Sequence, residues 1–223
     1  MEPQGVRMHM DEKVLRNLSY GMYVVTTLNE DKYAGCIANA VMQVTSTPAT
    51  LLISINKENY TNLCIKKCHK FAISILSENT DPRIIGQFGF KSSKDVDKFS
   101  GVDYSLKGNL PIINNSCGYL ICEVIDQVET STHTLFIGKI TDTGDYNEEI
   151  PMTYRYYHTQ LKGTSPKNAP TYIEEKKEEK RNSDHLKRWK CKVCGYIYEG
   201  ESLPNDFICP ICGQPHTVFE EIK

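Results

Sequence analysis

The sequence predicts a mainly β protein, in which a curled, barrel-like sheet with a few peripheral helices is followed by a small metal-bound domain. Runs of β-branched and aromatic residues recur between residues 21 and 141. Two C-x2-C pairs lie near the C-terminus, and a charged stretch separates them from the β-rich part. The 223 residues allow one domain of ordinary size and one small appendage.

Side-chain patterns predict the elements of the β-rich part. Residues 11–18 space their apolar side chains as a short amphipathic helix would. Strands are predicted over residues 21–28, 33–37, 41–45, 50–55, 70–76, 118–129 and 131–141. The first two strands form a hairpin through a turn at 29–32. Together the strands make a mostly antiparallel sheet with too many strands to stay open without curling.

Two further helices are expected between these strands. Asn59 opens a helix over 60–67, and Pro82 precedes another over 83–90. Residues 91–101 have the composition of an exposed, charged connector. The sequence has no internal repeat and no G-x-G-x-x-G motif after a strand, so a Rossmann nucleotide domain has no support.

Composition and charge limit the class of protein. A net charge of -2 and a hydrophobic content of 39% are typical of a soluble globular protein and argue against a general nucleic-acid binder. Residues 1–11 contain no apolar secretion segment, and the cysteines outside the two pairs follow no disulfide spacing, so we expect a cytoplasmic protein. Residues 33–56 are uncharged, but their many amides and hydroxyls argue against a membrane-spanning helix.

The two cysteine pairs predict a metal site. In each pair, Cys191 with Cys194 and Cys209 with Cys212, a two-residue turn aims both sulfurs at one ion. A glycine follows each pair and permits the positive φ that such a turn requires. Four thiolates make a closed tetrahedral site, which holds structural zinc or an iron that carries single electrons.

The residues around these pairs resemble the short rubredoxin domains that are fused to larger redox proteins. Trp189 precedes the first pair, Tyr196 and Tyr198 follow it in C-G-Y-x-Y, Asp206 precedes the C-P-x-C-G motif and Phe219 follows it. The resemblance implies one iron in a rubredoxin-like domain over residues 189–223. A zinc ribbon, which shares the cysteine turns, remains the alternative. Metal binding should supply much of the folding free energy of so small a domain.

Amide and hydroxyl side chains gather in residues 39–48 and 55–61, at strand edges and at the start of the helix opened by Asn59. Such groups suit a flat heteroaromatic ring with a phosphate, because amides pair with the polar ring edge and a helix start attracts an anion. Taken alone, these residue types are more typical of ordinary turns and strands than of a ligand site.

The order of motifs over residues 11–172 resembles the flavin reductase-like split β-barrel family. The motifs are A-N-A-V-x-Q-V-T-S-x-P, I-N-K-x-N-Y-T, F-A-I-S-I-L-S, I-G-Q-F-G-F, D-K-F and T-H-T-L-F-I-G. The resemblance implies FMN at a homodimer interface and hydride from NADH or NADPH. The residues implied to surround the flavin are Asn39, Ala40, Val41, Gln43, Val44, Thr45, Ser46, Asn56, Lys57, Asn59, Tyr60, Thr61, Phe88 and Gly89.

His133 matches the position of the family's active-site histidine, beside the nicotinamide and flavin rings, and is the implied catalytic residue. Many family members carry an acidic residue directly before this histidine, whereas this chain has Thr132. Because an adjacent carboxylate favours the imidazolium, the protonation state of His133 is left open. Without the motif, a lone histidine in a strand would be read as a structural residue.

A second group, Cys64, Cys68 and His69, could imitate half a metal site. We interpret Cys64 and Cys68, like Cys36, Cys117 and Cys122, as packed thiols, because no second ligand pair is apparent in this part of the chain. Residues 174–188 are nearly all charged or polar and are expected to form a solvated linker. The predicted domains are therefore 1–173 and 189–223.

The two resemblances meet in the group of proteins called high molecular weight rubredoxins. They imply an oxidoreductase that passes electrons from NAD(P)H through FMN to an iron held by the four thiolates and on to a protein acceptor, with a flavodiiron oxygen or nitric oxide reductase as the implied partner. One alternative is a flavin reductase that supplies reduced flavin to a monooxygenase. Another is a non-catalytic interaction protein that carries a flavin or a zinc ribbon. The expected assembly is a homodimer that binds neither membrane nor nucleic acid.

Overall fold

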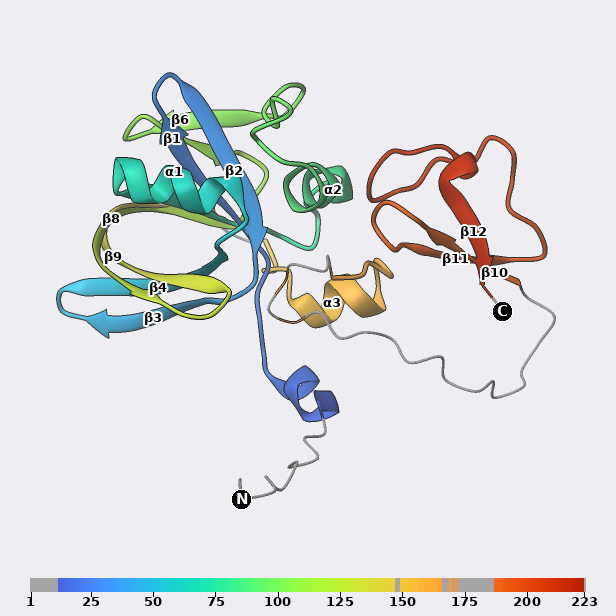
Figure 1. Ribbon diagram of the computed structural model, residues 1–223, viewed down its shortest axis with the longest axis horizontal. Coiled ribbons are helices and arrows are strands. Elements are labelled where there is room, and N and C mark those ends of the chain that lie inside the picture. The colour runs from blue at the N-terminus through green and yellow to red at the C-terminus, as the bar shows by residue number, and fades with distance from the viewer. Residues whose placement is uncertain (1–11, 147–148, 166–168, 170, 172–186, 223) are drawn as a thin grey trace, which may run out of the picture.

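A computed structural model describes residues 12–146, 149–165, 169, 171 and 187–222 of the chain (Figure 1). In chain order, its elements are η1 (Glu12–Asn17), β1 (Tyr23–Asn29), β2 (Lys32–Ala38), β3 (Val41–Ser46), β4 (Ala49–Asn56), α1 (Tyr60–Cys68), β5 (Lys70–Ile75), α2 (Pro82–Phe90), β6 (Tyr104–Lys107), β7 (Leu110–Ile113), β8 (Gly118–Glu129), β9 (His133–Asp145), α3 (Tyr154–Thr159), β10 (Lys187–Cys191), β11 (Ile197–Gly200), η2 (His216–Val218) and β12 (Phe219–Ile222).

Seven antiparallel strands form one curled sheet in the order β2-β1-β5-β8-β9-β4-β3. The two outer strands, β2 and β3, are not hydrogen-bonded to each other, so the barrel is split along one side. Val25, Ile53, Phe71 and Phe136 come from four different strands and are fully buried inside the curl. Burial of such side chains drives the sheet to close around them. The mainly β prediction is confirmed.

The two predicted helices of the barrel are present, with the expected caps. The side chain of Asn59 accepts a hydrogen bond from the Thr61 amide at 3.0 Å and so starts α1. The side chain of Asp81 accepts one from the Arg83 amide at 2.9 Å, with Pro82 at the first turn of α2. Helix α1 packs against β1, β2 and β4, and α2 packs against β2.

One prediction for the barrel is wrong. The expected exposed connector at 91–101 contains Lys98 and Phe99, which are only 2% and 4% exposed. The Lys98 ammonium donates hydrogen bonds to the carbonyl oxygens of Gly35 (2.8 Å) and Phe88 (3.0 Å), and the Phe99 ring packs edge-on against that of Phe88. A buried cation is tolerated here because backbone carbonyls replace its water.

Three elements also differ from expectation. The β6–β7 hairpin and α3 were not predicted, because both are short. The N-terminal helix is a 3-10 helix, η1. At the C-terminus, Lys187 and Arg188 pair with β11, so the predicted linker 174–188 ends two residues too late. The remainder of that linker, 174–186, lies outside the described residues.

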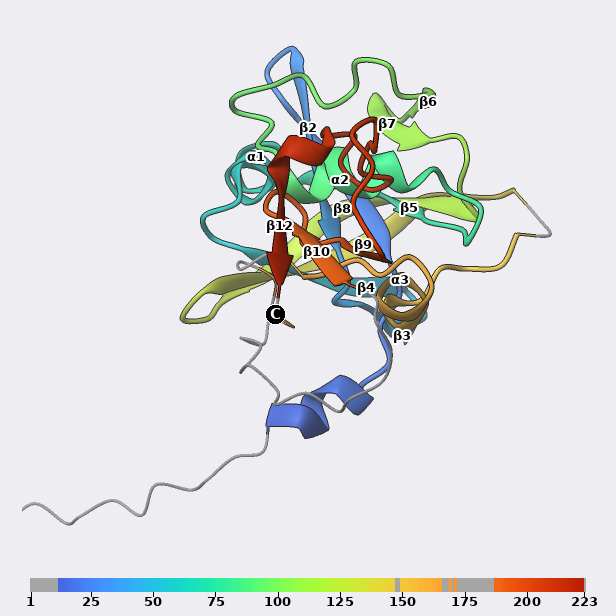
Figure 2. The same cartoon turned by 90° about the vertical axis from the view of Figure 1, so that its right-hand side faces the viewer.

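The C-terminal domain is a three-stranded sheet in the order β11-β10-β12. Trp189 pairs with Tyr198 across β10 and β11, and Phe207 and Phe219 pack near them as a small aromatic core. Figure 1 shows α2 and α3 between the barrel and this domain, and Figure 2 shows the C-terminal domain in front of α2. Within the described ranges, the helices are all too short or too polar to cross a membrane.

Candidate functional site

A cavity of about 410 Å³ opens between the barrel and helices α2 and α3. This volume falls in the range of roughly 300–1,000 Å³ that is typical of small-molecule pockets. Of the residues predicted to surround a ligand, those that line the cavity are Asn39, Asn56, Asn59, Tyr60, Phe88, Gly89 and His133. They come from separate strands and helices that the curl of the sheet brings together.

The other predicted contact residues do not line this cavity. They are Ala40, Val41, Gln43, Val44, Thr45, Ser46, Lys57 and Thr61. Four of them, residues 43–46, are exposed on β3, which is an edge strand of the sheet in the described part of the chain. Thr61 is instead fully buried in α1.

Several cavity residues were not predicted. Ser54, Ile55 and Glu58 lie in or next to the I-N-K-x-N-Y-T motif, so the motif itself was the available signal. Tyr154 and Tyr157 line the cavity from α3. Their i, i+3 spacing would have indicated one face of a helix.

Two buried polar atoms have no hydrogen-bond partner among the described residues, namely Oγ1 of Thr61 and Nε2 of His133. A buried polar group without a partner is costly, so at the cavity wall such an atom marks a place where a ligand completes the hydrogen bonding. Of the two, only His133 lines the cavity. His133 lies opposite Asn56 across β9 and β4, at the cavity wall. These observations fit a ligand that offers polar atoms along a flat edge, as a flavin does.

The protonation state of His133 follows from its surroundings. Burial lowers its pKa, since desolvation penalises the charged form. Nδ1 lies 2.8 Å from the hydroxyl oxygen of Thr132, which can donate to a neutral imidazole but supplies no negative charge. The site therefore favours neutral His133 near neutral pH.

A metal centre is formed by Cys191, Cys194, Cys209 and Cys212, whose sulfurs all lie within 4.8 Å of one another. The sulfurs of Cys191 and Cys212 are 3.6 Å apart, and those of Cys194 and Cys209 are 3.4 Å apart. Thiolates about 2.3 Å from a shared ion are separated by roughly 3.8 Å in a tetrahedron. The four sulfurs therefore fit one tetrahedral ion.

The two cysteine turns have matching backbones. The amides of Gly195 and Gly213 each donate 2.9 Å hydrogen bonds, to the carbonyl oxygens of Cys191 and Cys209 respectively. Gly195 has a φ of 76° and Gly213 a φ of 68°. Both values lie in the left-handed region that glycine adopts without a steric penalty, as predicted for these turns.

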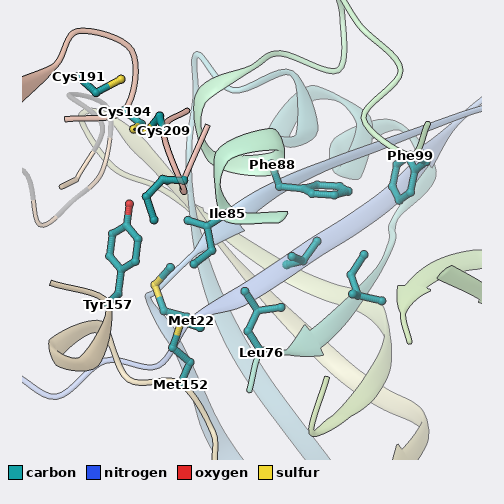
Figure 3. Close-up of a cluster of buried hydrophobic side chains, with 13 residues drawn as sticks. Met22, Leu76, Ile85, Phe88, Phe99, Met152, Tyr157, Cys191, Cys194 and Cys209 are labelled. Carbon is teal, nitrogen blue, oxygen red and sulfur yellow. Dashed lines mark hydrogen bonds between the residues drawn. The ribbon is translucent and has the colours of Figure 1, made fainter. Parts of the chain in front are cut away.

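The cavity and the metal centre share a wall formed by Met22, Ile85 and Tyr157. All three residues line the cavity. All three also belong to the buried cluster that contains Cys191, Cys194, Cys209 and Ile211. In Figure 3 the hydroxyl end of Tyr157 points toward Cys194 and Cys209, and Ile85 lies between these cysteines and Phe88. These side chains therefore belong both to the lining of the cavity and to the buried cluster around the cysteines.

The remaining cysteines lie apart from this centre. Cys64 is buried, and the Cys68 sulfur lies 2.8 Å from the Thr27 hydroxyl oxygen. Cys36 lines the cavity and is buried, and burial raises its pKa. Burial likewise raises the pKa of Cys122 to about 12. These two thiols therefore stay protonated at neutral pH.

Comparison with known proteins matches each of the two domains to a protein family. Residues 15–165 match the family model described as flavin reductase like domain, and residues 189–220 match that of the rubrerythrin, rubredoxin-like domain. The chain is 39% identical over 230 residues to high molecular weight rubredoxin from Moorella thermoacetica, in an alignment that covers 96% of this chain and 100% of that protein.

Two further proteins resemble the first domain alone. A ferric-chelate reductase (NAD(P)H) from Archaeoglobus fulgidus is 36% identical over 169 residues, which cover 75% of this chain and 100% of that protein. The solved structure of flavin reductase PheA2 in its native state superposes with a TM-score of 0.56 at 31% identity, over 65% of this chain and 93% of that one. The chain therefore belongs to the flavin reductase-like family and is a homologue of high molecular weight rubredoxin, with a four-cysteine rubredoxin-like domain after its flavin reductase-like domain.

Proposed function

We propose that this protein takes a hydride from NADH or NADPH onto FMN and passes the electrons singly to an iron in the four-cysteine centre, which hands them to a protein acceptor. The shared wall of Met22, Ile85 and Tyr157 carries this proposal, because it brings a ligand cavity and a metal centre to the two sides of one layer of side chains. Electron tunnelling weakens steeply as the gap between two centres widens, so this proximity favours transfer.

Four polar residues of the cavity have roles in this proposal. Asn39, Asn56 and Asn59 hold the polar edge of the flavin, and the start of α1 attracts its phosphate. His133 positions the nicotinamide through its unpaired Nε2 and remains neutral during hydride delivery. A flavin held in the cavity would supply the conversion of a two-electron hydride into single electrons, so one hydride would serve two reductions of the iron, with reoxidation by the acceptor between them.

A homodimer is part of the proposal. The edge strand β3 exposes Met42 (59%) and Val44 (47%), and β8 exposes Ile125 (56%) and Val128 (48%). Large apolar side chains gathered on a sheet favour contact with another protein surface. If a second copy packed on this face, the predicted residues 43–46 of one copy would contact a ligand bound in the other copy.

The acceptor is proposed to be a protein with a basic face, such as a flavodiiron oxygen or nitric oxide reductase. The rubredoxin-like domain, residues 189–223, has three lysines against five acidic side chains, and four thiolates around ferric iron add one negative charge. Complementary charge steers such an encounter, and the steering weakens as salt rises.

The test is an anaerobic titration of the flavin- and iron-loaded protein with NADH or NADPH, in which the flavin and iron absorption bands are followed separately. We expect both bands to bleach. If the flavin bleaches while the iron stays ferric, the protein is instead a flavin reductase that supplies reduced flavin to a monooxygenase. If neither bleaches, it is a non-catalytic interaction protein.

A further inference from the structure

Both cysteine turns of the rubredoxin-like domain contact the flavin reductase-like domain of the same chain. The hydroxyl of Thr164 donates a 2.8 Å hydrogen bond to the carbonyl oxygen of Cys194, in the first turn. At the second turn, a Cβ added to Gly86 would overlap the carbonyl oxygen of Ile211 and lie 2.9 Å from the α-carbon of Cys212. The backbone of α2 thus approaches the second turn as closely as a residue without a side chain permits.

An ion pair lies at the edge of this contact. The Lys162 ammonium and the Glu199 carboxylate are 3.0 Å apart, and their side chains are 46% and 41% exposed. The hydrogen bond from Lys162 lowers the pKa of Glu199, so the carboxylate is charged at neutral pH. An ion pair this exposed adds little affinity, but it fixes the orientation in which the two domains meet.

From these contacts we infer that Gly86, Lys162 and Thr164 form a docking seat, which holds the metal face of the rubredoxin-like domain against the shared wall of its own chain and must release it before another protein can reach the metal. The docking itself follows from the contacts alone. That the iron receives its electrons in this docked position rests on the proposed function.

Exclusion of an outside acceptor follows from which surface is covered. Cys191, Cys194 and Cys209 are each 1% exposed with the domain seated, Cys212 is partly exposed, and the backbones of both cysteine turns face α2 or Thr164. The covered face therefore carries both cysteine turns, and an acceptor protein that docks on these turns needs that face. The seat has few polar contacts, which suits an interface that opens and closes.

Docking is tested on the full chain by treatment with a water-soluble carbodiimide, which joins an amine to a carboxylate in direct contact. We expect an amide between Lys162 and Glu199 in chains that keep single-chain mass on a denaturing gel. Gly86→Ala and Thr164→Val should each lower its yield several-fold. Thr159→Val is the matched control, because the Thr159 hydroxyl bonds only within α3, to the Arg155 carbonyl oxygen.

An internal standard comes from the barrel, where the ammonium of Lys66 and the carboxylate of Glu129 are 2.8 Å apart. The yield of that crosslink should be the same in every variant. A Lys162–Glu199 crosslink found only at double-chain mass would overturn the inference, since docking would then be between chains. An unchanged yield in both Gly86→Ala and Thr164→Val would overturn it as well.

Exclusion of the acceptor is tested with the crosslinked, iron-loaded protein after chemical reduction by dithionite. Cytochrome c serves as a basic, one-electron protein acceptor: each ferrous four-cysteine centre loses one electron and each ferric haem gains one. We expect reoxidation of the iron to slow at least tenfold compared with Lys162→Gln treated in the same way. Equal rates would show that the seated domain still delivers electrons, which would overturn the inference.

This readout does not depend on nicotinamide or flavin chemistry. If the titration with NADH or NADPH fails while the crosslink and the slowed reoxidation appear, the docking seat stands and the proposed function does not. The reverse pattern would retain the proposed function and remove the seat.

Discussion

Gly86 on α2 and Ile211 in the second cysteine turn lie so close that a single methyl group on the α-carbon of Gly86 would overlap the carbonyl oxygen of Ile211. The two residues belong to different domains and are far apart in the sequence. Their contact links the position of the metal centre to the helix that also carries Ile85 and Phe88 into the cavity.

Replacement of Gly86 by alanine should have opposite effects on the two domains. Gly86 lies inside α2, where alanine is favoured over glycine by about 1 kcal/mol, so the free energy of unfolding of the barrel should rise. The same methyl group should release the rubredoxin-like domain. Hydrogen exchange read domain by domain would check both effects. A barrel that is destabilised would indicate that Gly86 packs within its own domain instead.

The variant His133→Ala should retain flavin but slow flavin reduction by NADH or NADPH on the order of tenfold to a hundredfold. The reason is that the unpaired Nε2 lies at the cavity wall, where it acts on the nicotinamide and not on the metal. Stopped-flow absorbance separates this step from iron reduction. An unchanged rate of flavin reduction would assign His133 to structure.

The substitution Thr132→Asp should raise the pKa of His133. The Thr132 oxygen lies 2.8 Å from Nδ1, so a carboxylate there would favour the imidazolium that burial now disfavours. NMR titration of the imidazole protons, assigned with His133→Gln, measures the shift. A pKa that is unchanged or lower would mean that residue 132 does not control the charge of His133.

Lys98 should make the stability of the barrel depend on pH. Burial lowers its pKa from 10.5 to about 8, so between these values the unfolded chain binds more protons and the free energy of unfolding rises with pH. The full shift corresponds to about 3 kcal/mol. The variant Lys98→Met lacks this gain. Urea unfolding followed by circular dichroism should show that the free energy of unfolding of the wild type rises relative to that of Lys98→Met from pH 8 to 10.5. A difference between the two free energies that stays constant over this range would contradict the prediction.

The native protein should contain one iron per chain, and removal of the metal should unfold the rubredoxin-like domain while leaving the barrel folded. Trp189 is the single tryptophan and is 9% exposed beside the cysteines, so its fluorescence reports on this domain alone. A chelator should shift its emission toward that of a solvated tryptophan. Stoichiometric zinc in protein from an iron-replete native host would refute the iron assignment; zinc taken up during recombinant expression would not, because thiolates bind either metal.

The parts that the sequence predicted are those that depend on local chemistry. The cysteine turns follow from C-x2-C-G, and the starts of α1 and α2 follow from Asn59 and Asp81, because each signal acts within a few residues. Seven of the predicted residues line the cavity, because the motifs mark strand ends (Asn39, Asn56, His133), the start of α1 (Asn59, Tyr60) and the end of α2 (Phe88, Gly89), which meet there.

What escaped prediction depends on contacts between distant segments. The burial of Lys98 requires the carbonyl oxygens of Gly35 and Phe88, and no local pattern announces that pairing. The closeness of Gly86 to Ile211 is likewise a tertiary fact, since a glycine inside a helix has several explanations in sequence. The approach of the metal centre to the cavity could not be foreseen for the same reason.

The central claim is that electrons pass from the flavin cavity to the four-cysteine centre within one molecule of the assembled protein. It is tested most directly by mixing the flavin- and iron-loaded protein with NADH or NADPH under anaerobic conditions and measuring the rate of iron reduction at several protein concentrations. The account predicts that iron reduction follows flavin reduction at a rate that does not change when the protein is diluted. A rate that falls in proportion to protein concentration, or iron that remains ferric, would contradict it.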